Sequence, residues 1–137
     1  MSHGSVRYLD PPRALSAWER AVLERLIGFA PSDLQESLLG QSPQLQVVRQ
    51  CDCGCASVEF ERETHGDRLV IDGVGDDSDG MEIMFLLHVL GGRISSLESV
   101  RGDGEPSLRS PEASQIDRVE WDQTGPNEAV ARRVQDP

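Results

Sequence analysis

The segment Glu82–Leu90 constrains the fold most, because it is almost continuously apolar. Such a run fits a central strand covered on both faces, although periodicity alone also allows a buried helix. Gly91 and Gly92 follow directly and predict a tight hairpin turn. We therefore expect the chain to return as a second strand over residues 93–101.

Alternating apolar and polar residues predict further strands around this hairpin. Within residues 93–101 the apolar side chains recur every third position, and a bulge near Ser95–Ser96 reconciles that spacing with a strand. The other predicted strands, the last of them a short edge strand, cover residues 45–50, 56–61, 69–74 and 116–121.

Two short helices are predicted before the strands. Ser16 and Glu19 form a capping box, in which each side chain can hydrogen-bond the backbone amide of the other, and an amphipathic pattern then extends to about Gly28. A second helix start lies at Ser32, with Gly40 as the residue that ends this helix. The tight turn between them predicts an αα-hairpin.

Together these elements predict an α+β fold, with the N-terminal helical hairpin packed on one face of a curved antiparallel sheet of about five strands. Only one face of such a sheet must be apolar, which fits a hydrophobic content of 37%. The expected organisation is a flexible arm over 1–13, a single α+β domain over 14–122 and a flexible tail over 123–137.

Charge narrows the range of partners. The 24 acidic and 13 basic residues give a net charge of −11, which repels nucleic acid and membrane surfaces. A basic protein partner remains open, although an acidic surface that keeps the protein soluble is the simpler interpretation. Every basic residue is arginine, a pattern typical of a GC-rich bacterial genome, and Schiff-base chemistry on lysine is excluded. No apolar run reaches the roughly 20 residues that span a bilayer. With no signal-peptide pattern, we expect a cytoplasmic protein.

The unusual motif is a cluster of three cysteines, Cys51, Cys53 and Cys55, spaced C-x-C-x-C. On alternate residues of a strand they would pack as small apolar side chains, and this is the interpretation we favour. The alternative is a zinc site, completed by His65 or His88, although zinc ligands are usually spaced C-x₂₋₄-C. A redox-active or nucleophilic thiol is a third interpretation.

Other motifs are weaker. The acidic loop 72–80 could bind calcium, but its spacing departs from the EF-hand pattern and favours a solvated turn. His88, in the apolar run, is predicted to be a core residue hydrogen-bonded to a neighbour. His3 is a still weaker candidate for a functional histidine. Residues 101–103 spell Arg-Gly-Asp and predict a turn. No phosphate-binding loop, zinc-protease or nucleophile-elbow motif is present in the sequence.

Three segments, residues 15–20, 49–57 and 92–98, resemble a group of small hypothetical proteins from high-GC bacteria, with the likeness covering about Ala14 to Pro106. The cysteine segment is its distinctive part. The group has no assigned activity, so the resemblance implies no catalytic residue and no cofactor.

Three functions remain open. The first hypothesis is a non-catalytic cytosolic binding protein, for example an immunity-type protein that neutralises a basic partner; a homodimer is compatible with it. The second is a metal-binding module built on Cys51, Cys53 and Cys55. The third is a small enzyme with a pocket between the helices and the sheet.

Overall fold

The computed structural model describes residues 6–51, 56–61, 65–106, 111–126 and 128–134. In these residues the fold is α+β, as predicted, with two α-helices near the N-terminus and one antiparallel sheet. The helical elements are α1 (Ala17–Ile27), α2 (Ser32–Gln41) and the 3₁₀ turns η1 (Ser42–Gln44) and η2 (Ala113–Gln115). The strands are β1 (Val6–Ala14), β2 (Gln46–Cys51), β3 (Val58–Glu59), β4 (Arg68–Asp76), β5 (Glu82–Leu90), β6 (Arg93–Arg101), β7 (Asp117–Gly125) and β8 (Glu128–Val134).

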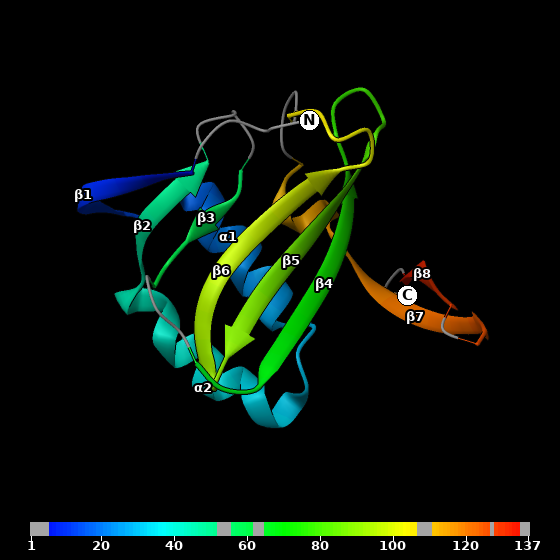
Figure 1. Ribbon diagram of the computed structural model, residues 1–137, viewed down its shortest axis with the longest axis horizontal. Coiled ribbons are helices and arrows are strands. Elements are labelled where there is room, and N and C mark those ends of the chain that lie inside the picture. The colour runs from blue at the N-terminus through cyan, green and yellow to red at the C-terminus, as the bar shows by residue number, and fades with distance from the viewer. Residues whose placement is uncertain (1–5, 52–55, 62–64, 107–110, 127, 135–137) are drawn as a thin grey trace.

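The sheet is larger than predicted. Its described part has eight strands in the order β1-β2-β3-β6-β5-β4-β7-β8, not about five (Figure 1). The count was wrong because β1 lies largely in the predicted flexible arm, residues 1–13, and β8 lies in the predicted flexible tail, residues 123–137. That residues 14–122 fold as a single domain stays a prediction.

Strand β1 was missed because Pro11 and Pro12 argued against it. Its pairing with β2 is interrupted between Tyr8 and Arg13, so neither proline needs a ladder partner. The strand also lies at the edge of the sheet, where a missing N–H is tolerated.

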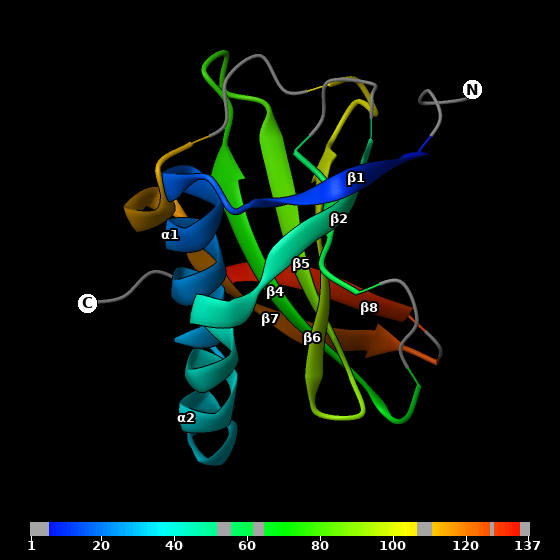
Figure 2. The ribbon, with the colours of Figure 1, turned by 90° about the vertical axis from the view of Figure 1, so that its left-hand side faces the viewer.

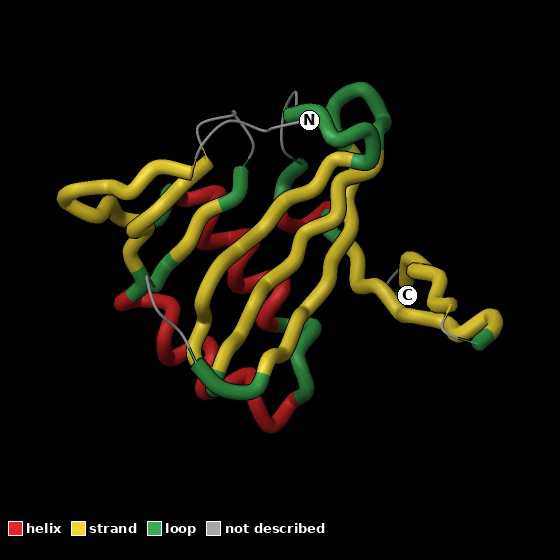
Figure 3. Tube along the Cα trace, viewed as in Figure 1, coloured by secondary structure: helices red, strands yellow, loops and turns green. Residues whose placement is uncertain are grey.

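Strand β8 was missed because ion pairs contribute to its placement, and apolar alternation does not reveal them. It forms a hairpin with β7 that projects from the rest of the sheet (Figure 3). Arg132 binds Glu120 across this hairpin at 2.6 Å, and Arg133 reaches Asp76 on β4 at 3.1 Å.

Helix α1 begins where predicted. Ser16 Oγ accepts from the Glu19 amide at 3.1 Å, and Glu19 Oε1 accepts from the Ser16 amide at 2.8 Å. Both Arg13 Nη atoms donate to the Glu19 carboxylate at 2.8 Å, tying β1 to the helix. Burial would raise the pKa of Glu19, but the hydrogen bonds from Arg13 and Ser16 outweigh it, and that pKa lies below its usual value.

The core lies between the helices and one face of the sheet, as the side view shows (Figure 2). The apolar face of α1, including Leu23 and Leu26, is fully buried against side chains such as Phe85 and Leu87. Along β5 the odd-numbered residues are buried and the even-numbered ones between them are half-buried. The helices therefore cover one face of the apolar strand, where the sequence predicted cover on both.

Helix α2 begins at Ser32 as expected, but Pro31 is its N-cap residue and makes no side-chain capping hydrogen bond. The helix buries Leu38 and leaves Leu39 45% exposed. That α1 and α2 pack as a hairpin stays a prediction. In the described part of the chain, neither helix has the length and hydropathy to cross a membrane.

The hairpin between β5 and β6 confirms two local predictions. Gly91 and Gly92 form its turn with φ angles of 59° and 80°, which only glycine adopts at low cost. The register shifts by one residue between His88 and Val89, so the predicted bulge is present and Ser95 is its additional residue.

The two turn glycines provide a matched pair of variants. Gly92→Ala should cost about 1–2 kcal/mol, the strain of a left-handed alanine. Gly91→Ala should cost about 2–5 kcal/mol, because its Cβ would also lie 2.3 Å from the His65 carbonyl oxygen and overpacking adds about 1–3 kcal/mol. Urea unfolding measures the free energy of unfolding of both variants. An equal loss of stability in the two variants would contradict the contact predicted for Gly91→Ala.

Candidate functional site

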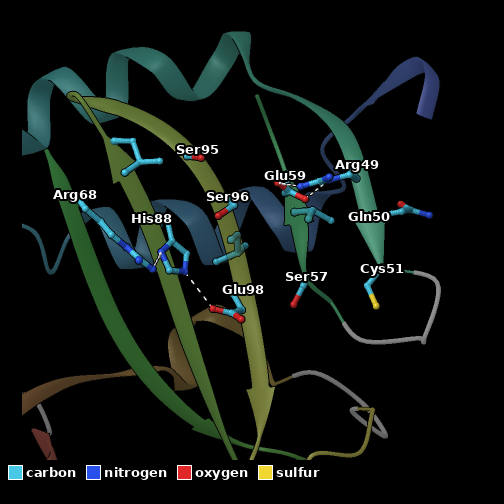
Figure 4. A pocket seen from close by; sticks show the side chains of 13 residues that line it. Arg49, Gln50, Cys51, Ser57, Glu59, Arg68, His88, Ser95, Ser96 and Glu98 are labelled. Carbon is cyan, nitrogen blue, oxygen red and sulfur yellow. Dashed lines mark hydrogen bonds and ion pairs between the residues drawn. The ribbon is translucent and has the colours of Figure 1, made fainter. Parts of the chain in front are cut away.

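The face of the sheet that the helices leave uncovered, here called the helix-free face, carries a hollow of about 420 Å³ between β2–β3 and β5–β6 (Figure 4). Strand β3 has just two residues, Val58 and Glu59, which pair with β2 on one side and β6 on the other. The hollow lies beside this narrow junction. It therefore differs from the predicted pocket between helices and sheet.

One wall of the hollow is a chain of three polar side chains from β4, β5 and β6. Arg68 Nη2 lies 3.0 Å from His88 Nδ1, and His88 Nε2 lies 3.1 Å from Glu98 Oε1. Since a guanidinium can only donate, Nδ1 is the acceptor. In the neutral ring Nε2 then carries the hydrogen and donates to Glu98. The hydrogen-bond network thus assigns one tautomer of His88.

This arrangement does not match a Ser–His–acid triad. Ser96 lies opposite His88 in the strand register, but a triad needs one ring nitrogen on the acid and the other on the hydroxyl. Here the second nitrogen accepts from Arg68. The three side chains hold each other in position, and the geometry does not activate a nucleophile.

The opposite wall contains a second arginine that is already paired. Arg49 donates to Glu59 through Nε and, at 2.5 Å, through Nη2. Its guanidinium also lies over the Tyr8 ring, 5.0 Å from the centroid. The hydrogen bond to Glu59 raises the pKa of Arg49 above its usual value.

The cysteine prediction is only partly covered by the structure. Cys51 ends β2, is half-buried and lines the hollow, whereas Cys53 and Cys55 lie outside the described residues, as does His3. His65 is exposed before β4, and both ring nitrogens of His88 have partners. Within the described ranges no three His, Cys, Asp or Glu side chains are grouped to hold a metal. The zinc alternative stays a prediction.

The helix-free face also carries an apolar patch, formed by Val70, Met84, Leu86, Val100 and Trp121. Strand register puts the first four on one face of β4, β5 and β6. Trp121, on β7, donates Nε1 at 2.5 Å to Asp72, which lies between Val70 and Val74 on the same face of β4. Val100 is 44% exposed and Trp121 is 54% exposed, so this patch is open to a partner.

Carboxylates gather beside this patch, where β4 turns into β5 and β6 ends. This acidic end consists of Asp76, Asp79, Glu82, Asp103 and Glu105, with the buried Asp77 beneath. Contacts link its members: Asp76 is opposite Glu82 in the register, and the Glu105 amide donates to Asp103.

Arg101 holds the acidic end together. Its guanidinium, 8% exposed, binds Asp77 at 2.7 Å, Asp79 at 2.6 Å and Asp103 at 2.9 Å. The hydrogen bonds from Arg101 lower the pKa values of Asp79 and Asp103. The positive charge among these carboxylates is thus a guanidinium, which supports a turn here and not the calcium alternative. The turn predicted at Gly102–Asp103 is confirmed. The loop predicted over residues 72–80 is shorter than expected, because β4 continues to Asp76.

Sequence analysis named His88 but missed Arg68, Glu98, Arg49 and Glu59. The position of Glu98 near His88 could have been predicted from the sequence. The two-glycine turn and a one-residue bulge together pair His88 with Ser96. Glu98 is then two residues further along the same face.

Arg101→Gln should lower the melting temperature strongly at pH 7, because it leaves the buried Asp77 without its charged partner. The folded pKa values of Asp79 and Asp103 are lowered. Their stabilisation is therefore present above the ordinary value of about 3.9 and is lost as the pH falls through the lower folded values. The difference in melting temperature between wild type and Arg101→Gln should therefore become smaller as the pH falls.

Thermal unfolding at pH 7, 5 and 3 measures this gap. Arg132→Gln is the matched control, since Arg132 binds the exposed Glu120, and it should change the melting temperature little. An Arg101→Gln variant as stable as wild type at pH 7, or a gap that widens toward pH 3, would contradict the role given to Arg101.

In comparisons with protein-family models, curated proteins and solved structures, this chain has no significant match. The resemblance to small proteins of high-GC bacteria therefore stays a prediction, and function is inferred from the geometry of the helix-free face.

Proposed function

We propose that this chain is a non-catalytic bacterial binding protein of the cytoplasm that docks a basic protein partner on its helix-free face. The observation that carries the proposal is strand β5. It is apolar on both faces, a pattern of strands covered on both sides, and the helices cover only one. A partner would bury the other side.

The chemistry of this face favours a particular partner. The apolar patch would be the centre of the interface and the acidic end its charged rim, the usual arrangement of protein interfaces. Carboxylates at the rim select a basic partner and accelerate its association. Neutralisation of a basic toxin domain, as by an immunity protein, is one form of such binding.

A second copy of this chain is a less suitable occupant, because it would carry the same net charge of −11. The arrangement of His88 supports the non-catalytic part of the proposal. Both of its ring nitrogens are engaged, one by Arg68 and the other by Glu98.

Affinity capture from a lysate of the native host, with three versions of the protein as bait, tests the proposal. Leu86→Arg puts a positive charge into the apolar patch and should abolish capture. Leu39→Arg makes the same change on the exposed surface of α2, so this variant should capture as much partner as wild type does. The captured protein should be basic, and its retention should fall as salt rises, since salt screens rim charges.

Thermal unfolding verifies that both variants are folded. Equal capture by Leu86→Arg and wild type, or no protein retained by wild type, would contradict the proposal. Retention of a second copy alone would replace the basic partner with a homodimer.

A further inference from the structure

We propose that the hollow binds a small organic monocarboxylate with an apolar body, and that Arg68 holds its carboxylate. This inference goes beyond the proposed function, because it concerns a small ligand at the opposite end of the helix-free face from the acidic end.

Arg68 is the observation that carries the inference. The chain has 24 acidic residues for 13 arginines, and Arg13, Arg49 and Arg101 each bind carboxylates. Arg68 forms no ion pair with any carboxylate in the described ranges. It donates to the neutral His88 ring and keeps both its charge and further N–H groups for a ligand.

His88 acts as a positioning residue for this guanidinium. Glu98 accepts from Nε2, which leaves the Nδ1 lone pair to orient Arg68 at the hollow (Figure 4). A guanidinium presents its donors in a planar fork that matches two carboxylate oxygens. The site is thus built for an anion before the anion arrives.

The charges around the hollow favour a monoanion. Glu59 already binds Arg49, whereas the Arg68 guanidinium has no carboxylate partner among the described residues. One further negative charge can bind at Arg68, whereas a dianion such as phosphate would meet stronger repulsion from both glutamates and from the net charge of −11.

The rest of the wall fits an apolar body. The half-buried Leu90 is among the lining residues, and the stem of Arg68 adds aliphatic surface. The volume of about 420 Å³ lies in the range of small-molecule sites, about 300–1,000 Å³. Ser96, whose hydroxyl faces the hollow between the two walls, adds a polar group that can orient a ligand (Figure 4).

Titration of the ¹⁵N-labelled full chain with hexanoate, followed by amide chemical shifts, tests the inference. Hexanoate should give saturable shifts at residues around the hollow. Arg68→Gln should weaken binding at least about tenfold, the effect of losing about 1.4 kcal/mol from a charge-assisted hydrogen bond. Arg7→Gln, which changes an exposed arginine on β1, is the matched control and should bind as wild type does.

A second variant keeps Arg68 but supplies an internal carboxylate. Ser96→Glu puts a carboxylate opposite His88, where it competes with the ligand for the Arg68 guanidinium, and it should also weaken binding at least about tenfold. The amide spectrum of each variant establishes that it is folded.

The neutral 1-hexanol and inorganic phosphate serve as control ligands, and both should bind more weakly than hexanoate. The inference is overturned by the absence of saturable shifts with hexanoate, by unchanged affinity in Arg68→Gln, or by equal binding of 1-hexanol or phosphate. Such a result leaves the partner proposal intact, because Leu86→Arg tests that proposal at the apolar patch, away from Arg68.

Discussion

The packing of α1 against one face of the sheet is the constraint on which the rest of the structure depends. Leu23 and Leu26 on the helix and Phe85 and Leu87 on β5 are all fully buried, and each contributes about 1.5–3 kcal/mol of burial energy. Because strand side chains alternate, this packing directs His88 and its even-numbered neighbours to the opposite face. The hollow and the apolar patch are consequences of that alternation.

Ion pairs stabilise the parts of the structure that lie outside the hydrophobic core. Arg13 joins the edge strand β1 to α1, Arg133 joins β8 to β4, and Arg101 gathers carboxylates where β6 ends. In a chain with a hydrophobic content of 37%, guanidinium–carboxylate pairs thus help to extend the sheet beyond the helices. Arg68 differs from these three arginines, because its partner among the described residues is the His88 ring and not a carboxylate.

The features that could be predicted from sequence are local ones. The capping box, the glycine turn and the bulge each depend on residues within a few positions of one another, and all three are present. Strands β1 and β8 could not be predicted, because contacts between distant residues, such as Arg133 with Asp76, contribute to their placement. Part of the site was within reach through hairpin register, but the hollow depends on the shortness of β3, which no local pattern reveals.

The two-residue strand β3 has a consequence for motion. Strands β1 and β2 pair with each other and connect to the rest of the sheet through β3. In the described residues, β3 has two register pairs with β2 and two with β6. This outer ribbon should therefore open as a cooperative unit at a lower free energy than β4–β6, and its amide hydrogens should exchange sooner. A molecule that filled the hollow between this ribbon and β6 would bind the closed form alone, and mass action would then slow that exchange.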